Sequence, residues 1–167
     1  MRIRLLAVLS YFVLAFTTPG AAAEGALSVT REAELQVAPG ELWGVIGGFG
    51  ALHQWHPAIA ALELTGDGTQ PGDKRVLTLG DGAQVFETLE AYDAAGMRYS
   101  YTITESPLPV ANYHSTVSVV PAAGGRSKVS WTSTFDADGA SPEDAIGAVA
   151  GVYEAGLDAL QSRYNSQ

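Results

Sequence analysis

Six short segments in which apolar and polar side chains alternate follow one another between residues 58 and 135. The turns that separate them are short and rich in glycine, aspartate and proline. Strands joined by short turns pair antiparallel, since a parallel crossover needs a dozen or more residues. The predicted strands are 58–65, 74–79, 83–92, 98–105, 112–120 and 128–135. This stretch of the chain therefore predicts an antiparallel sheet.

Helical signals lie on both sides of these strands, after one more predicted strand at residues 27–37. Pro39 can open a short helix, which the glycines at 47, 48 and 50 end, and residues 52–56 can form a further helical turn. Near the C-terminus, Ser141 is a predicted N-cap. Apolar side chains then recur at three- and four-residue spacing, at Ile146, Val149, Tyr153, Leu157, Leu160 and Tyr164. This stripe predicts one long amphipathic helix.

Together these elements predict an α+β helix-grip fold. A curved seven-stranded antiparallel sheet carries two short helices after its first strand, and the long C-terminal helix lies across its concave face. A helix and a concave sheet diverge along their length, and such gaps become ligand cavities when aromatic and a few polar side chains line them. The length of 167 residues favours a single domain, predicted here as residues 24–167.

The first 23 residues have the layout of a secretory signal peptide. Arg2 and Arg4 precede an apolar run at residues 5–16, and Ala21-Ala22-Ala23 offers a cleavage site before Glu24. Twelve helical residues reach about 18 Å, too short for a bilayer core of about 30 Å. We therefore expect export to the periplasm or beyond, with cleavage near Ala23 and no membrane span in the mature form.

The charge balance excludes some classes of partner. The chain has 9 basic and 18 acidic residues, and loss of the two N-terminal arginines takes the formal net charge from −9 to −11. Nucleic acids are bound through Lys and Arg contacts to phosphates, so this balance argues against a nucleic-acid partner. The absence of cysteine excludes disulfides and a cysteine-linked lipid anchor. The core alone must hold the fold together.

Several short strings occur in an order and at gaps that resemble the SRPBCC superfamily, which includes START, Bet v1 and polyketide cyclase/dehydrase-like proteins. The strings are Trp43-Gly44-Val45-Ile46 with Phe49, Trp55-His56-Pro57, Pro71-Gly72 with Arg75, Phe86-Glu87-Thr88-Leu89-Glu90 with Asp93, Tyr99-Ser100-Tyr101, and Asn112-Tyr113. The resemblance covers residues 26–165 and points to a branch with small exported bacterial proteins, among them an accessory protein of methanol oxidation. Plant abscisic-acid receptors and lachrymatory-factor synthase are also similar.

The resemblance implies which residues line the cavity. In the plant relatives an arginine and a glutamate on neighbouring strands do so, and Arg75 and Glu87 match them. Tyr113 and Tyr101 match aromatic wall positions, while Val149 and Tyr153 match by position on the C-terminal helix. The loop at residues 106–109 occupies the place of a lid, but its sequence departs from the receptors' gate.

Alternation along the strands supports the same pair independently. Glu87 shares a face with the aliphatic Val85 and Leu89, so burial there would require a partner for its charge. A hairpin centred near residue 81 places Arg75 directly opposite Glu87. We predict a charge pair about 3–4 Å apart, inside or at the lip of the cavity. A weakly paired Glu87 could act as a base, a paired one as a polar anchor, and a structural ion pair is the alternative.

Other candidates carry weaker signals. The same alternation puts Glu105 on the face of Tyr101, which predicts a position at the cavity mouth. Trp55 is a candidate ligand contact, although we expect Trp55 and His56 mainly to pack the short helix against the sheet edge. His53 and His56 have no acid or cysteine at ligand spacing, so we predict no metal and no cofactor. Nucleotide-loop and G-x-S-x-G motifs do not occur.

Three functions are compatible with these features. The first is an exported protein that binds or carries a small hydrophobic or aromatic molecule. The second is a cyclase, dehydratase or isomerase in which Glu87 moves a proton, Arg75 steadies an oxyanion, and Tyr101 or Tyr113 orients the substrate. The third is an accessory protein that docks its acidic surface on a periplasmic redox enzyme.

Overall fold

The computed structural model describes residues 26–166, so the predicted signal peptide lies outside the described residues. The strands are β1 (Leu27–Leu35), β2 (Ile59–Thr65), β3 (Lys74–Leu79), β4 (Gln84–Asp93), β5 (Arg98–Glu105), β6 (Val110–Pro121) and β7 (Ser127–Ala137). The helices are α1 (Pro39–Ile46) and α2 (Pro142–Asn165), with 3-10 turns η1 (Phe49–Gln54) and η2 (Ala123–Gly125). Every predicted element is present, with ends shifted by a few residues.

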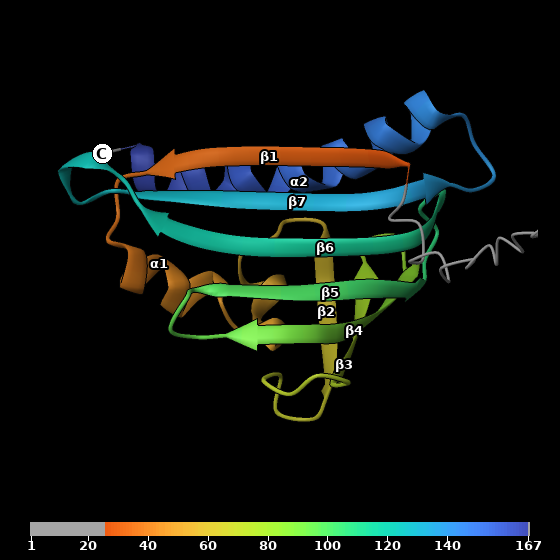
Figure 1. Ribbon diagram of the computed structural model, residues 1–167, viewed down its shortest axis with the longest axis horizontal. Helices are drawn as coiled ribbons and strands as arrows, with labels where there is room; N and C mark the ends of the chain where they lie inside the picture. The colour runs from red at the N-terminus through yellow and green to blue at the C-terminus, as the bar shows by residue number, and fades with distance from the viewer. Residues whose placement is uncertain (1–25, 167) are drawn as a thin grey trace, which may run out of the picture.

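All seven strands form one antiparallel sheet in the order β1-β7-β6-β5-β4-β3-β2. Figure 1 shows the sheet bending so strongly that β2 and β3 run across the direction of β1 and β7. The long helix α2 lies along the β1 and β7 side, while α1 and η1 close the space under the other strands. The α+β helix-grip prediction is therefore confirmed.

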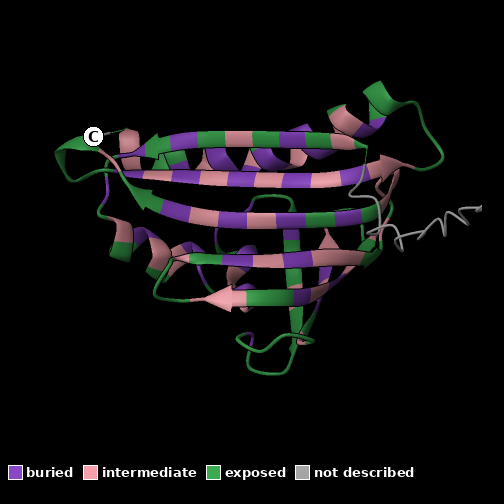
Figure 2. Cartoon of the chain, viewed as in Figure 1, coloured by how far each residue is buried: buried purple, intermediate pink, exposed green. Residues whose placement is uncertain are grey.

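Burial follows the predicted periodicity in both kinds of element. Figure 2 shows buried residues alternating with more exposed ones along β6 and β7, as expected for a sheet with one covered face. In α2, Ser141 caps the first turn by accepting a hydrogen bond from the Asp144 amide (3.1 Å). The buried stripe of α2 is Ala145, Val149, Ala150, Tyr153, Gly156, Leu157 and Leu160. The helix thus presents its apolar face to the sheet.

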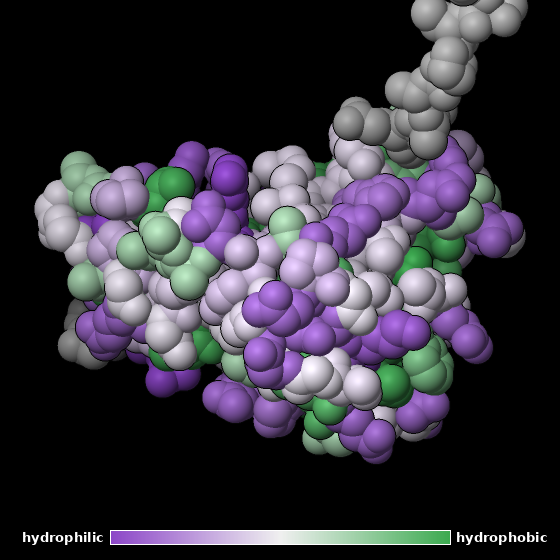
Figure 3. Space-filling view, turned by 60° about the horizontal axis from the view of Figure 1, so that its bottom comes forward, coloured by the Kyte–Doolittle hydropathy of each residue, from purple (hydrophilic) through white to green (hydrophobic). Residues whose placement is uncertain are grey.

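Few large hydrophobic residues are exposed on the described surface. Leu64 and Val120 are its exposed large hydrophobic residues within residues 26–166. On the face drawn in Figure 3, hydrophobic residues form separate small areas among hydrophilic ones. In the described part of the chain, no helix is long and apolar enough to cross a membrane. The apolar groups that could bind a ligand must therefore be sought inside the molecule.

Candidate functional site

An ion pair lies inside the domain, on adjacent strands. Arg75 of β3 is directly opposite Glu87 of β4, and its Nε donates a hydrogen bond to Glu87 Oε2. Both side chains are buried. Arg75 Nη1 also donates to the Phe49 carbonyl (2.7 Å), and the guanidinium lies over the rings of Phe49 (4.2 Å) and Tyr101 (4.9 Å). The predicted pairing and its apolar face are confirmed.

Burial and pairing act on the two charges in opposite directions. Burial raises the pKa of Glu87, while the adjacent Arg75 guanidinium lowers it by a smaller amount. Burial also works to lower the pKa of Arg75, but Glu87, Tyr99 and Tyr101 outweigh it and raise that pKa. The guanidinium therefore stays charged. Its Nε and Nη1 are hydrogen-bonded within the protein, while its buried Nη2 has no partner among residues 26–166.

A cavity of about 110 Å³ lies between the sheet and α2, beside Glu87. Its apolar lining consists of Leu52, Ala58, Ile59, Leu77, Leu79, Val85, Ile103, Leu108, Trp131, Val149 and Val152. Its polar or amphipathic lining consists of His56, Glu87, Tyr101, Tyr113 and Tyr153. Glu87 uses Oε2 for Arg75, and its Oε1 accepts no hydrogen bond from residues 26–166. An acceptor is thus left open on an apolar wall.

The hydroxyl groups beside the cavity form a chain with a fixed direction. Ser115 Oγ donates to the Thr132 carbonyl (2.9 Å), so it must accept from the Tyr153 hydroxyl (3.0 Å). Tyr153 therefore accepts from the Tyr113 hydroxyl, to which it is also hydrogen-bonded. Burial raises the pKa of Tyr153 to about 12 and that of Tyr113 well above its usual range, which keeps both protonated.

Tyr101 ends a second branch of this network. Trp131 Nε1 donates to the Tyr101 hydroxyl oxygen (3.0 Å) and to Ser115 Oγ (3.1 Å). Because an indole nitrogen can only donate, the Tyr101 proton is left without an acceptor among residues 26–166. Burial raises the pKa of Tyr101 well above its usual range, so this proton stays in place. The cavity therefore offers a donor at Tyr101 and an acceptor at Glu87.

His56 is held neutral by its two ring nitrogens. Nδ1 accepts from the Ala58 amide (3.2 Å), and Nε2 lies 2.9 Å from the Val152 carbonyl, to which it must donate. Burial lowers the pKa of His56. Gly156 of α2 allows this approach, since a Cβ there would lie 2.7 Å from His56 Cδ2 and 3.0 Å from the Trp55 ring. His56 and Trp55 thus pack against α2, while η1 contacts the edge strand β2 as expected.

The protonation of His56 should lower stability in mild acid. An unfolded histidine takes up a proton below about pH 6.5, whereas the folded His56 resists it because its pKa is lowered. Its contribution is therefore complete above about pH 6.5 and is lost as the pH falls toward the folded pKa. An NMR titration should give His56 a midpoint below 6.5, with the exposed His53 as a second signal in the same sample. A midpoint at or above 6.5 would contradict the buried neutral form.

The predicted site residues divide into three groups. The cavity brings together Glu87, Tyr101, Tyr113, Val149 and Tyr153. Arg75 and Trp55 are buried behind this lining: Arg75 supports Glu87, and Trp55 packs on Trp131 with ring centroids 5.7 Å apart. Glu105 is exposed and lies away from the cavity.

The position predicted for Glu105 is wrong because of a β-bulge. Consecutive residues Phe86 and Glu87 of β4 pair with Glu105 and Ile103 of β5, so Thr104 is an extra residue. The bulge reverses the alternation at this point. Glu105 therefore comes opposite Phe86, which points to the face away from Glu87, and not onto the face of Ile103.

Two lining residues were not among the predicted site residues. Trp131 lies within the strand predicted at residues 128–135 and His56 was expected beside a sheet edge, yet both reach the cavity wall. The sequence gives no local sign of such contacts, because the residues that meet are far apart along the chain. His56 and Val152, for example, are 96 positions apart. The aliphatic lining follows from strand alternation, which marks the concave face without marking where the cavity lies on it.

The comparisons with known proteins agree with this architecture. The protein XoxI from Bacillus cereus is 35% identical with a TM-score of 0.78, covering 83% of this chain and 96% of that one. An uncharacterised protein from Bacillus thuringiensis is also 35% identical, with a TM-score of 0.78 and coverage of 84% and 100%. A Thermobifida fusca protein is 33% identical, with a TM-score of 0.72 and coverage of 83% and 93%.

No curated protein matches the chain. The family described as polyketide cyclase/dehydrase and lipid transport matches residues 26–165, which is the whole sheet and the whole of α2. This family and the structural neighbours share the helix-grip fold of the SRPBCC superfamily. The chain therefore belongs to the polyketide cyclase/dehydrase and lipid transport family.

Proposed function

We propose that this protein binds and carries a small, mainly apolar molecule that bears one hydroxyl group. The observation that carries the proposal is the pair of open hydrogen-bonding positions in an otherwise apolar cavity, the Tyr101 proton and Glu87 Oε1. A ligand hydroxyl can accept from Tyr101 and donate to Glu87 at once. Such a group satisfies both positions, which burial would otherwise leave unpaired at a cost.

Other polar groups fit the cavity less well. A carbonyl oxygen can accept from Tyr101 but leaves Glu87 without a donor. A carboxylate would meet the negative charge of Glu87, while the Arg75 guanidinium lies behind Glu87 and outside the lining. The site therefore favours a neutral ligand over an organic acid.

The volume limits the ligand to roughly one small ring or a short chain. For comparison, an engineered apolar cavity of about 150 Å³ in another protein binds benzene. The cavity here measures about 110 Å³, and its lining comes from strands, η1 and α2, together with the loop residues His56, Ala58 and Leu108. A ligand much larger than phenol would require the wall to move.

The preference for a hydroxyl can be measured with phenol and benzene. We expect phenol to bind about threefold to tenfold more tightly than benzene, since a net hydrogen bond contributes about 0.5–1.5 kcal/mol. Tyr101→Phe should reduce this preference, since only the hydrogen bond to Glu87 remains, and should leave benzene binding unchanged. Calorimetric titration of both ligands checks it, with Tyr164→Phe, a half-buried tyrosine outside the cavity, as the matched control. Equal losses for the two ligands in Tyr101→Phe, or no binding of either by the wild type, would contradict the proposal.

The proposed carrier acts outside the cytoplasm. Support comes from the layout of residues 1–23, with a basic start, an apolar run and small residues before Glu24. We expect protein recovered from the periplasm or the medium to begin at Glu24, as measured by intact mass. A cytoplasmic protein that retains its first 23 residues would overturn this part of the proposal.

One observation favours a catalytic variant of the same site. Glu87 combines an open carboxylate oxygen with a pKa raised by burial, which suits a general base facing a bound hydroxyl. Arg75 cannot play the predicted role of oxyanion stabiliser, because it does not line the cavity. Glu87→Gln should then abolish turnover of a substrate while keeping its binding. Unchanged turnover in this variant would remove Glu87 from any mechanism.

A further inference from the structure

We infer that Trp131 and Tyr153 form an internal wall that ends the cavity and thereby sets the size of ligand the protein accepts. The inference rests on the proposed function, since it concerns the same cavity. It assigns a specificity role to two residues whose burial alone would suggest ordinary packing. The evidence comes from both layers of the fold, the sheet and the helix.

On the concave face of the sheet, inward-facing residues of neighbouring strands form rows. Counted from Glu87 toward Trp131, only the first two rows line the cavity. The first row contains Glu87 opposite Ile103, and both line the cavity. The second row contains Tyr101 opposite Ser115, of which Tyr101 lines it. The third row contains Tyr99 opposite Val117, which itself lies opposite Trp131.

Tyr99 and Val117 are buried and lie outside the lining. From this third row onward the sheet is packed core. Trp131 is the member of the row that reaches back to the cavity, and it does so through its hydrogen bond to Tyr101. On the sheet side, the wall is therefore the Trp131 side chain.

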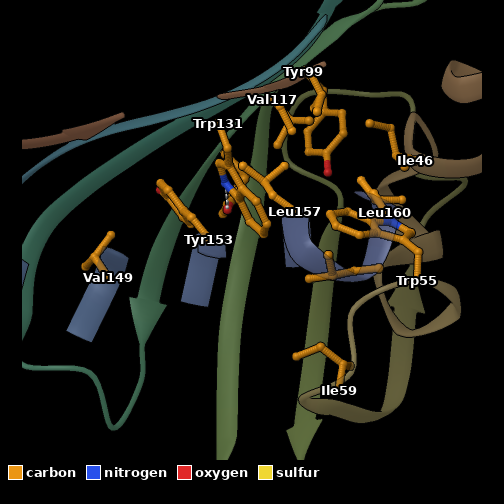
Figure 4. Close-up of a cluster of buried hydrophobic side chains, with 14 of the residues drawn as sticks. Ile46, Trp55, Ile59, Tyr99, Val117, Trp131, Val149, Tyr153, Leu157 and Leu160 are labelled. Atoms are coloured by element: carbon orange, nitrogen blue, oxygen red, sulfur yellow. Dashed lines mark hydrogen bonds between the residues drawn. The ribbon is translucent and has the colours of Figure 1, made fainter. Parts of the chain in front are cut away.

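The helix shows the same limit at the same level. Val149, Val152 and Tyr153 of α2 line the cavity. Leu157 and Leu160, one and two turns further on, are buried and do not. Figure 4 shows Val149 on one side of the Tyr153–Trp131 stack and Leu157 on the other. The cavity therefore occupies only the first part of the space between α2 and the sheet.

The wall is held firmly. The Trp131 and Tyr153 rings stack with centroids 4.3 Å apart at 14°. Trp131 is hydrogen-bonded to Tyr101 and Ser115, and Tyr153 to Ser115. Stacking adds to the energy of burial, and the hydrogen bonds fix the orientation of both rings. Neither ring can turn aside without breaking several contacts.

Shortening the wall should therefore enlarge the cavity at its inner end. Trp131→Leu removes most of an aromatic side chain beside the Tyr101 hydroxyl, which is one of the two groups that would hold a ligand hydroxyl. A ligand with bulk beside its hydroxyl should gain most from this space. Among simple aromatic alcohols, 1-naphthol carries its second ring on that side, and phenol carries none.

The test compares 1-naphthol with phenol by calorimetric titration of the wild type, Trp131→Leu and Trp131→Phe. The wild type should bind phenol and discriminate against 1-naphthol. Trp131→Leu should shift the ratio of the two affinities toward 1-naphthol by at least about tenfold, because burial of each additional carbon contributes about a fourfold gain. Trp131→Phe, the milder change, should shift it less and keeps the test open if the leucine variant does not fold.

Trp43→Leu is the matched control, since this half-buried tryptophan packs on Tyr92 and Tyr99 outside the cavity. Its affinity ratio should equal that of the wild type. If folded Trp131 variants bind phenol with an unchanged ratio of 1-naphthol to phenol affinity, Trp131 does not limit ligand size. That result would overturn this inference but not the proposed function. Failure of the wild type to bind phenol would instead overturn the proposed function.

Discussion

Replacing Arg75 with methionine should lower the free energy of unfolding by about 3–5 kcal/mol, because Glu87 would be left charged and unpaired in the core. The loss includes the hydrogen bond to the Phe49 carbonyl and the contacts of the guanidinium with two aromatic rings. Urea denaturation of the wild type and Arg75→Met measures the difference directly.

Two further variants separate the stranded charge from a general loss of packing. Arg75→Met/Glu87→Leu removes both charges and should recover much of the loss, since apolar replacement of a buried pair is often close to neutral. Arg31→Met removes an exposed arginine whose Nε lies 2.7 Å from Glu154 Oε1, and it should cost about 0–1 kcal/mol. If Arg75→Met cost no more than Arg31→Met, the pair would not be the buried unit described above.

Gly156→Ala should destabilise the protein by about 1–3 kcal/mol, whereas alanine usually stabilises a helix relative to glycine. The added Cβ would lie 2.7 Å from His56 Cδ2, 3.0 Å from the Trp55 ring and 3.2 Å from the Trp131 ring. These rings are buried and have little room to give way. Thermal and urea unfolding measure the effect.

Gly151→Ala is the control on the same helix. Nothing lies within 4 Å of a Cβ at Gly151, so this substitution should stabilise the protein by about 0.5–1 kcal/mol. The opposite signs of the two changes are the expected result. Stabilisation by both would show that α2 does not approach His56 as closely as the structure has it.

Local rules carried most of the fold prediction. Short turns between alternating segments predict antiparallel hairpins. The hairpin around residue 81 predicted that Arg75 lies opposite Glu87, and the structure confirms it. The apolar stripe of α2 follows from its 3.6-residue period, although Ile146 and Tyr164 at its ends are only half-buried. These features depend on residues close together in the sequence.

The errors arose where local periodicity fails or distant elements meet. A single extra residue, Thr104, turned Glu105 away from the cavity, and no local signal marks such a bulge. The contact of His56 with α2 depends on the missing side chain of Gly156, which matters only once the two segments are together. Trp131 lies within a predicted strand, but its part in the cavity wall depends on where the helix and sheet diverge.

A crystal structure of the protein grown with phenol tests the central claim most directly. The claim is that the cavity between the sheet and α2 holds a small apolar molecule by its hydroxyl group. The predicted result is a ring inside this cavity, with its oxygen about 2.6–3.0 Å from both the Tyr101 hydroxyl and Glu87 Oε1. A cavity that stays closed at saturating phenol, or a ring bound with its oxygen away from both groups, would contradict it.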